Sequence, residues 1–116
     1  MSDRLEERGV HNPKVVDLIS HDSDTGEVVL TMLETRPWGS APDQIKQVED
    51  KFNSYLGYVK GGMLEREYPQ YAGAPVVFRL ECSEAPSNQE NAFLTAVHGF
   101  AAEEGIRFEV VVIAAD

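Results

Sequence analysis

One thiol and one imidazole come closest to forming a nucleophile with its base. Cys82 alternates with apolar residues, so we expect it on the buried face of a strand, and His98 falls between apolar positions of a predicted helix. Buried single cysteines mostly act as small hydrophobic residues. We therefore predict no catalytic residue. Because Cys82 is the only cysteine, the chain can form neither an intrachain disulfide nor a cysteine-based zinc cluster.

Three possible metal ligands lie close together in the sequence: His21, followed by Asp22 and Asp24 within the segment DSDTG. A calcium-binding EF-hand loop that began at Asp22 would need glycine at its sixth position and glutamate at its twelfth. Those positions hold Glu27 and Leu33. A hairpin turn explains the segment instead, since the aspartate can accept bonds from the following amides and the glycine can adopt a left-handed conformation. We predict neither a metal site nor a cofactor.

Asp17 is a carboxylate within an otherwise apolar strand pattern. Burial would raise its pKa and make it a candidate for acid–base chemistry. Alternatively, it faces the solvated side of the sheet or pairs with an arginine such as Arg79 or Arg107. We favour this second interpretation.

The loops that follow two of the predicted strands carry residues suited to binding a small ligand, because open α/β sheets bind ligands at the carboxyl ends of parallel strands. The candidates are Arg36, Trp38, Ser40, Ser83 and Ser87. Helix N-termini and a guanidinium favour a carboxylate or phosphate, but nearby acidic residues disfavour a strongly anionic ligand. Trp38 is either a binding anchor or a lid that closes the core, and we favour the lid.

Four strands and two long helices are expected to position these residues. The strands are predicted over Val15–His21, Glu27–Thr35, Val76–Ser83 and Ile106–Ala114. The first helix is predicted from an N-cap at Ser40, with a capping box to Asp43, as far as Gly61. The second starts with a capping box of Ser87 and Glu90 and stops at Gly105. Met63–Tyr68 is predicted to add a short helical piece.

The element order predicts an α+β fold, a two-layer sandwich of order ββαβαβ with a four-stranded mixed sheet and two helices on one face. The last three strands run parallel because helical crossovers join them. The first strand is antiparallel and lies either outside the second strand or between the second and third. We expect residues 1–13 to form a flexible N-terminal arm and residues 14–116 to form the single domain.

The sheet face opposite the helices carries apolar residues that are expected to need a cover. By strict alternation this face includes Val15, Ile19, Val29, Leu33, Val77, Val111 and Ile113. We interpret it as a homodimer interface or a site for another protein partner. The alternative covers are the N-terminal arm and the piece Met63–Tyr68.

The charge of the chain restricts its partners. Twenty acidic and 10 basic residues give a formal charge of −10, which repels nucleic-acid phosphates and anionic lipids. We therefore expect no nucleic acid and no membrane as partners. With no apolar stretch of about 18 residues, we expect a cytoplasmic location.

Three segments in the first third of the chain carry a recognisable pattern. Asn12–Ile19 reads N-P-x-V-V-D-x-I, Asp22–Leu30 reads D-x-x-T-G-E-V-V-L, and Arg36–Trp38 reads R-P-W. With the later segments EREYP and EEGIRFEV, this pattern resembles an uncharacterised family of small bacterial domains of unknown function. The resemblance implies no activity or ligand.

Our leading hypothesis is a non-enzymatic domain that acts through protein association. The alternative is a small-ligand-binding or enzymatic domain with its site near Arg36 and Trp38.

Overall fold

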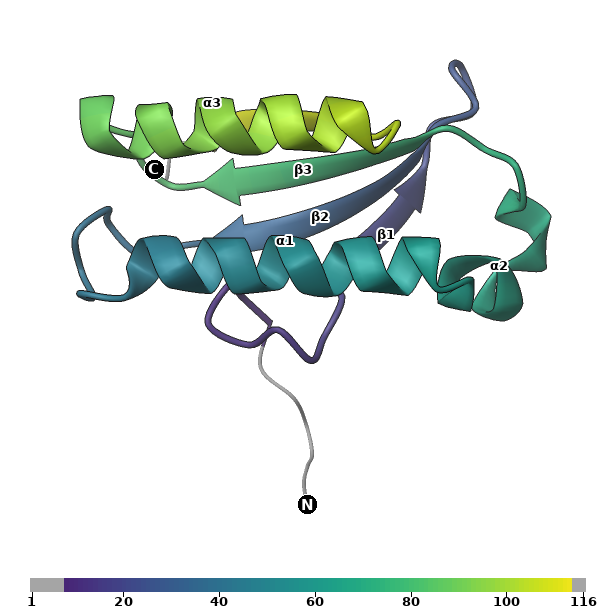
Figure 1. Ribbon diagram of the computed structural model, residues 1–116, viewed down its shortest axis with the longest axis horizontal. Helices are drawn as coiled ribbons and strands as arrows, with labels where there is room; N and C mark the ends of the chain where they lie inside the picture. The colour runs from purple at the N-terminus through teal and green to yellow at the C-terminus, as the bar shows by residue number, and fades with distance from the viewer. Residues whose placement is uncertain (1–7, 114–116) are drawn as a thin grey trace.

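The computed structural model describes residues 8–113, in which two long helices cover one face of a four-stranded sheet (Figure 1). The elements are β1 (Leu18–His21), β2 (Val28–Glu34), α1 (Gln44–Lys60), α2 (Met63–Glu67), the 3-10 helix η1 (Pro69–Tyr71), β3 (Val76–Cys82), α3 (Asn88–Glu103) and β4 (Arg107–Val112). The strand order is β1-β2-β3-β4, with β1 antiparallel to β2 and the other neighbours parallel. The predicted α+β sandwich is confirmed, and β1 lies outside β2.

The β1–β2 hairpin forms where the turn chemistry predicts it. The N–H of Asp22 donates to the carbonyl of Glu27 (2.8 Å), and the N–H of Gly26 donates to the carbonyl of Asp22 (2.7 Å). Gly26 has a φ of 77°, the left-handed conformation that glycine adopts without a Cβ clash. The side chain of Asp22 accepts the N–H of Asp24 at 2.9 Å, so the turn itself uses this carboxylate.

The two long helices begin differently from one another. The capping box that was predicted for α3 is present, and the N–H of Ser87 donates to the Glu90 carboxylate at 2.8 Å. The capping box predicted at Ser40 is wrong. Residues 40–43 form a turn instead, in which the N–H of Gln44 donates to the carbonyl of Ala41 (3.2 Å), so α1 begins after Asp43 without a side-chain cap.

The core lies between the sheet and the helices. From β2 and β3 it receives Val28, Leu30, Met32, Phe78 and Leu80, all fully buried. Phe52 of α1 packs edge-on against Phe78 and Phe108, with ring centroids 5.6 Å and 6.1 Å apart. Such edge-to-face aromatic contacts add to the apolar area that each ring buries, and they join α1 to β3 and β4.

The segment before β1 belongs to the domain. Val10, which lies inside the predicted arm 1–13, is buried in the core, and its N–H donates to the carbonyl of Leu33 at 2.9 Å. Val15, which we expected within the first strand, precedes β1 in a bend. The strand starts later because the carboxylate of Asp17 accepts the N–H of Leu33 (2.9 Å). This side-chain bond takes the place of a backbone hydrogen bond between β1 and β2 at that position. The mobility predicted for residues 1–7 lies outside the described residues.

Candidate functional site

The loop edge that we predicted as a ligand site has its polar groups joined to one another. The guanidinium of Arg36 donates two hydrogen bonds to the buried carboxylate of Glu34 in a bidentate arrangement, at 2.9 Å and 2.7 Å. It also donates to the side-chain oxygen of Gln47 at 2.7 Å. These three bonds use three of the guanidinium's roughly five N–H donors. Arg36 is therefore engaged within the protein.

Trp38 and Ser83 join the loop after β2 to the loop after β3. The indole N–H of Trp38 donates to the carbonyl of Glu84 at 3.0 Å, and its half-buried ring packs against the core. The hydroxyl of Ser83 donates to the carbonyl of Thr35 at 3.0 Å. Of the other two candidates, Ser87 caps α3, and Ser40 is exposed in the turn before α1. The nearest hollow contains only Ser83 among the five predicted ligand residues.

The Glu34 carboxylate is 1% exposed and its ionisation is maintained by Arg36. Burial opposes the charged form, but hydrogen bonds from the side chain and backbone of Arg36 outweigh this cost and hold the pKa of Glu34 below its usual 4.5. In the unfolded chain the carboxyl binds a proton more readily. Its stabilising contribution is therefore complete above pH 4.5 and is lost as the pH falls through the lower, folded-state pKa.

We expect Glu34→Gln to lower the free energy of unfolding by about 1–3 kcal/mol at neutral pH, because the guanidinium of Arg36 loses its charged partner. The loss is no larger because this guanidinium is partly solvated. The loss should shrink in acid, where the wild type also loses the charge. Urea unfolding at neutral pH and below pH 4.5 measures both effects. Glu65→Gln on the exposed surface of α2 is the control, and an equal loss at both pH values would contradict the assignment.

The sheet face away from the helices differs in part from our prediction. Ile19 pairs with Leu30 and packs against the core, so placing it on the uncovered face was wrong. The hairpin turn explains the error, since pairing His21 with Val28 puts every second residue of β1 opposite the core-facing residues of β2.

Val29 and Val77 lie on the uncovered face but are already buried within the monomer. Arg107 stands directly across from Val77, and the stem of a long arginine side chain shields apolar neighbours of this kind. An ion-pair chain crosses the same face: Arg79 contacts Glu109, while Arg107 contacts Glu109 (2.6 Å) and Glu27 (2.8 Å).

An uncovered hollow remains at the carboxyl end of this face. It measures about 300 Å³ and is lined by Leu33, Glu34, Thr35, Glu81, Cys82, Ser83 and Ile113. Ile113 is 53% exposed, and Leu33 and Val111 are half-buried. The structure thus brings together Leu33 and Ile113 from the predicted interface with Ser83 from the predicted ligand site.

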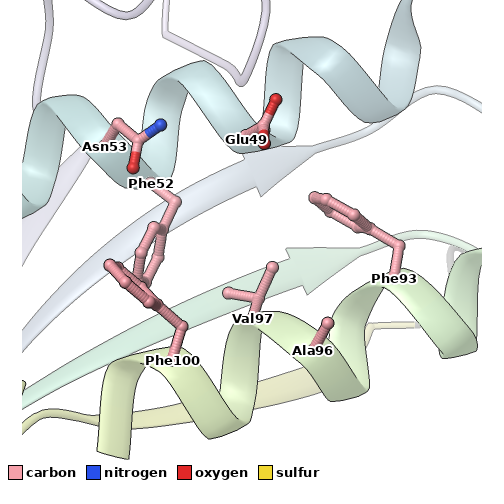
Figure 2. A pocket seen from close by; sticks show the side chains of 7 residues that line it. All are labelled: Glu49, Phe52, Asn53, Phe93, Ala96, Val97 and Phe100. Carbon is pink, nitrogen blue, oxygen red and sulfur yellow. The ribbon is translucent and has the colours of Figure 1, made fainter. Parts of the chain in front are cut away.

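A second apolar groove, which the sequence did not indicate, separates the two long helices (Figure 2). It measures about 330 Å³ and is lined by Glu49, Phe52 and Asn53 of α1 and by Phe93, Ala96, Val97 and Phe100 of α3. Phe100 on the wall of this groove is 44% exposed. The small side chain of Ala96, four residues before Phe100, was a signal for the groove, because it leaves space beside the larger rings.

Asp17 occupies a closed polar cluster, and our expectation that it faces solvent or pairs with Arg79 or Arg107 is wrong. Its carboxylate accepts the ammonium of Lys51 and the N–H of Gly9, each at 2.9 Å. Lys51 also donates to the carbonyls of Asn12 and Val15, and neither charged side chain is exposed. Desolvation lowers the pKa of Lys51, while Asp17 opposes that shift.

Tyr55 completes this cluster. Its hydroxyl donates to the carbonyl of Thr31 (2.6 Å) and accepts the N–H of Asp17 (2.8 Å). Lys51 was missed by the sequence reasoning, although it lies three residues after Val48 and four before Tyr55, on the apolar side of α1. Because solvent does not reach the cluster, we assign it a structural role.

The remaining candidates do not form a chemical site. Burial raises the pKa of the Cys82 thiol, which keeps it in the weakly nucleophilic protonated form. His21 stacks on Tyr71 with ring centroids 5.2 Å apart. Within residues 8–113, no three His, Cys, Asp or Glu side chains are grouped so that they could hold a metal ion. In the same range, no helix has the length and apolar character needed to cross a membrane.

The fold and its surfaces define a small α+β sandwich domain with one uncovered sheet face. Residues 8–114 match the model of DUF6572, a family of unknown function, and the chain belongs to that family. No curated protein and no solved structure matches the chain.

Proposed function

We propose that this domain acts without catalysis, by associating with a second copy of itself through the uncovered face of the sheet. The observation that carries the proposal is the hollow of about 300 Å³ on that face, with the exposed side chain of Ile113 on its wall. Exposed apolar side chains around a concave surface are typical of interaction sites.

The charge pattern on the same face of the sheet supports a protein partner. Arg79, Glu109 and Arg107 form ion pairs beside the apolar residues, and interfaces commonly combine an apolar centre with a polar rim. The formal charge of −10 disfavours nucleic acid and anionic membranes as partners. As part of the same proposal, we place the domain in the bacterial cytoplasm. The rival site near Arg36 and Trp38 has less support, because both side chains already bond within the protein.

We expect Leu33→Lys to weaken the dimer at least about tenfold, since it places a charge at the centre of the buried contact. Leu33 stands directly across from Glu81, so the new ammonium gains an ionic partner in the monomer and the fold should persist. Light scattering after size exclusion, over a series of concentrations, measures the change.

Phe100→Lys is the matched control, because Phe100 is also partly exposed but lies on the helix side of the domain. It should leave the dimer intact. The proposal fails if the wild type is monomeric at millimolar concentration, or if Leu33→Lys and the wild type dissociate equally.

A further inference from the structure

The free edge of the sheet at β4 presents unpaired backbone groups. Among the strands of residues 8–113, β4 has a neighbour on one side only. The N–H of Ile113 donates to the carbonyl of Cys82 at 2.8 Å. Since alternate residues of a parallel strand face opposite neighbours, Phe108, Val110 and Val112 direct their N–H and carbonyl groups away from β3. These three residues therefore offer six backbone groups along the free edge.

The sequence of β4 does not protect this edge. Natural edge strands usually carry lysine, proline or a bulge, or are very short. Residues 107–113 read RFEVVVI, with no lysine or proline. The two charged residues, Arg107 and Glu109, pair with each other at 2.6 Å, and Val112 is 45% exposed. The opposite edge strand, β1, has only four residues. An apolar edge of this length is suited to pairing with another strand.

The pattern along β4 is complementary to itself in one register. If two copies pair antiparallel with Val110 opposite the partner's Val110, then Phe108 lies opposite the partner's Val112, and all six outward groups of each copy are paired. The neighbouring registers, centred on Glu109 or on Val111, leave some of the outward backbone groups of β4 unpaired. The register centred on Glu109 would also place two like charges directly opposite one another, which is destabilising.

The surface beside β4 also fits this register. A hollow of about 260 Å³ lies between α3 and β4 and is lined by Asn91, Leu94, Thr95, His98, Phe108 and Val110. In the centred register the partner's Val112 lies across from Phe108, at the wall of this hollow. Apolar cross-strand pairs of this kind stabilise a sheet beyond their backbone bonds.

We propose that β4 is a strand-pairing site at which a second copy of this chain continues the sheet, with Val110 on the two-fold axis. This contact goes beyond the proposed function, because it uses the edge of the sheet and not its uncovered face. Each contact is isologous, so a chain that uses both assembles beyond a dimer.

Backbone amide exchange measured by NMR on the full chain tests the site directly. We expect the amides of Phe108, Val110 and Val112 to be protected at millimolar concentration and to lose protection on dilution. The amides of Glu109 and Val111 face β3 and should stay protected throughout. Outward amides that exchange freely at every concentration, or whose protection does not change on dilution, would overturn the proposal.

A proline at position 110 provides the matched variant. Because the N–H of Val110 points outward, Val110→Pro removes a donor from the edge while retaining the bonds between β3 and β4. The symmetric pair then loses two hydrogen bonds, so we expect the dissociation constant of the edge contact to rise at least about tenfold. Val110→Thr retains both the N–H and the β-branched shape and should pair like the wild type. Val112→Lys, which adds a protecting charge to the edge, should also weaken pairing and serves if the proline variant does not fold.

The two contacts fail in different ways. If Leu33→Lys abolishes the wild-type assembly while Val110→Pro and Val112→Lys leave it unchanged, the edge proposal is wrong and the face contact stands. The reverse result rejects the face contact and supports the edge.

Discussion

Replacing Asp17 by asparagine should lower the free energy of unfolding by about 3–5 kcal/mol, because it leaves the ammonium of Lys51 buried without its counter-ion. The pair is closed to solvent, and the carboxylate also accepts the backbone N–H groups of Gly9 and Leu33. Whole domains are stable by only about 5–15 kcal/mol, so a loss of this size removes a large part of the total. Urea unfolding followed by circular dichroism measures it.

The pH dependence of the Asp17→Asn variant identifies the cause of the loss. Desolvation already lowers the pKa of Lys51, and removing the carboxylate that opposes this shift should lower the pKa further. The unfolded chain then binds more protons than the folded chain over a wider range below pH 10.5. Stability rises with pH where the unfolded state binds more protons. The deficit of the variant should therefore become smaller as the pH approaches 10.5 from neutrality.

Two further variants serve as controls for this cluster. Lys46→Met removes an exposed ion pair with Asp50 (2.6 Å) from the same helix and should change stability by less than about 1 kcal/mol. The double variant Asp17→Asn/Lys51→Met should cost less than the sum of the single changes, because it leaves no buried charge alone. A loss below about 1 kcal/mol for Asp17→Asn would contradict a structural role for the pair.

The second large effect is expected at the aromatic centre of the core. Phe52→Ala should lower the free energy of unfolding by about 3–5 kcal/mol, through lost transfer energy and the cavity that remains. The ring is 3% exposed and contacts Phe78 and Phe108 edge-on. The cavity would open into the groove between α1 and α3 (Figure 2). Thermal and urea unfolding both report the change.

Phe100→Ala is the matched control for this prediction. The two rings are neighbours, with centroids 5.9 Å apart, but Phe100 is 44% exposed. Because its ring is only partly withdrawn from water, its removal should cost clearly less than removal of the Phe52 ring. Equal losses for the two variants would show that Phe52 does not act as a core residue in the way its burial indicates.

Local patterns in the sequence were sufficient to determine several parts of the fold. The turn residues Asp22 and Gly26 predicted the hairpin, and the spacing of Ser87 and Glu90 predicted the start of α3. Each of these signals depends on groups a few residues apart along the chain. The backbone there has few alternatives, so local chemistry selects the structure.

The helix cap predicted at Ser40 did not form, which shows the limit of such local signals. Its pattern resembles that at Ser87, with Asp43 in the position that Glu90 holds there, but residues 40–43 form a turn that joins the loop after β2 to α1. Gln44 holds this turn by accepting the N–H of Gly39 at 2.7 Å and donating to the carbonyl of Pro37 at 3.2 Å. Contacts that the cap pattern does not encode outweighed the cap.

The sequence by itself therefore determined the α+β class, the positions of the two long helices and the hairpin, because periodicity and turn chemistry act over short distances. Only the tertiary structure decided that Asp17 pairs with Lys51, 34 residues away, and that Ile19 faces the core. The physical reason is that strand register and the packing of α1 on the sheet choose which distant residues meet. The same packing left the edge of β4 free, which the local patterns did not indicate, whereas strand alternation had already predicted an uncovered face around Leu33.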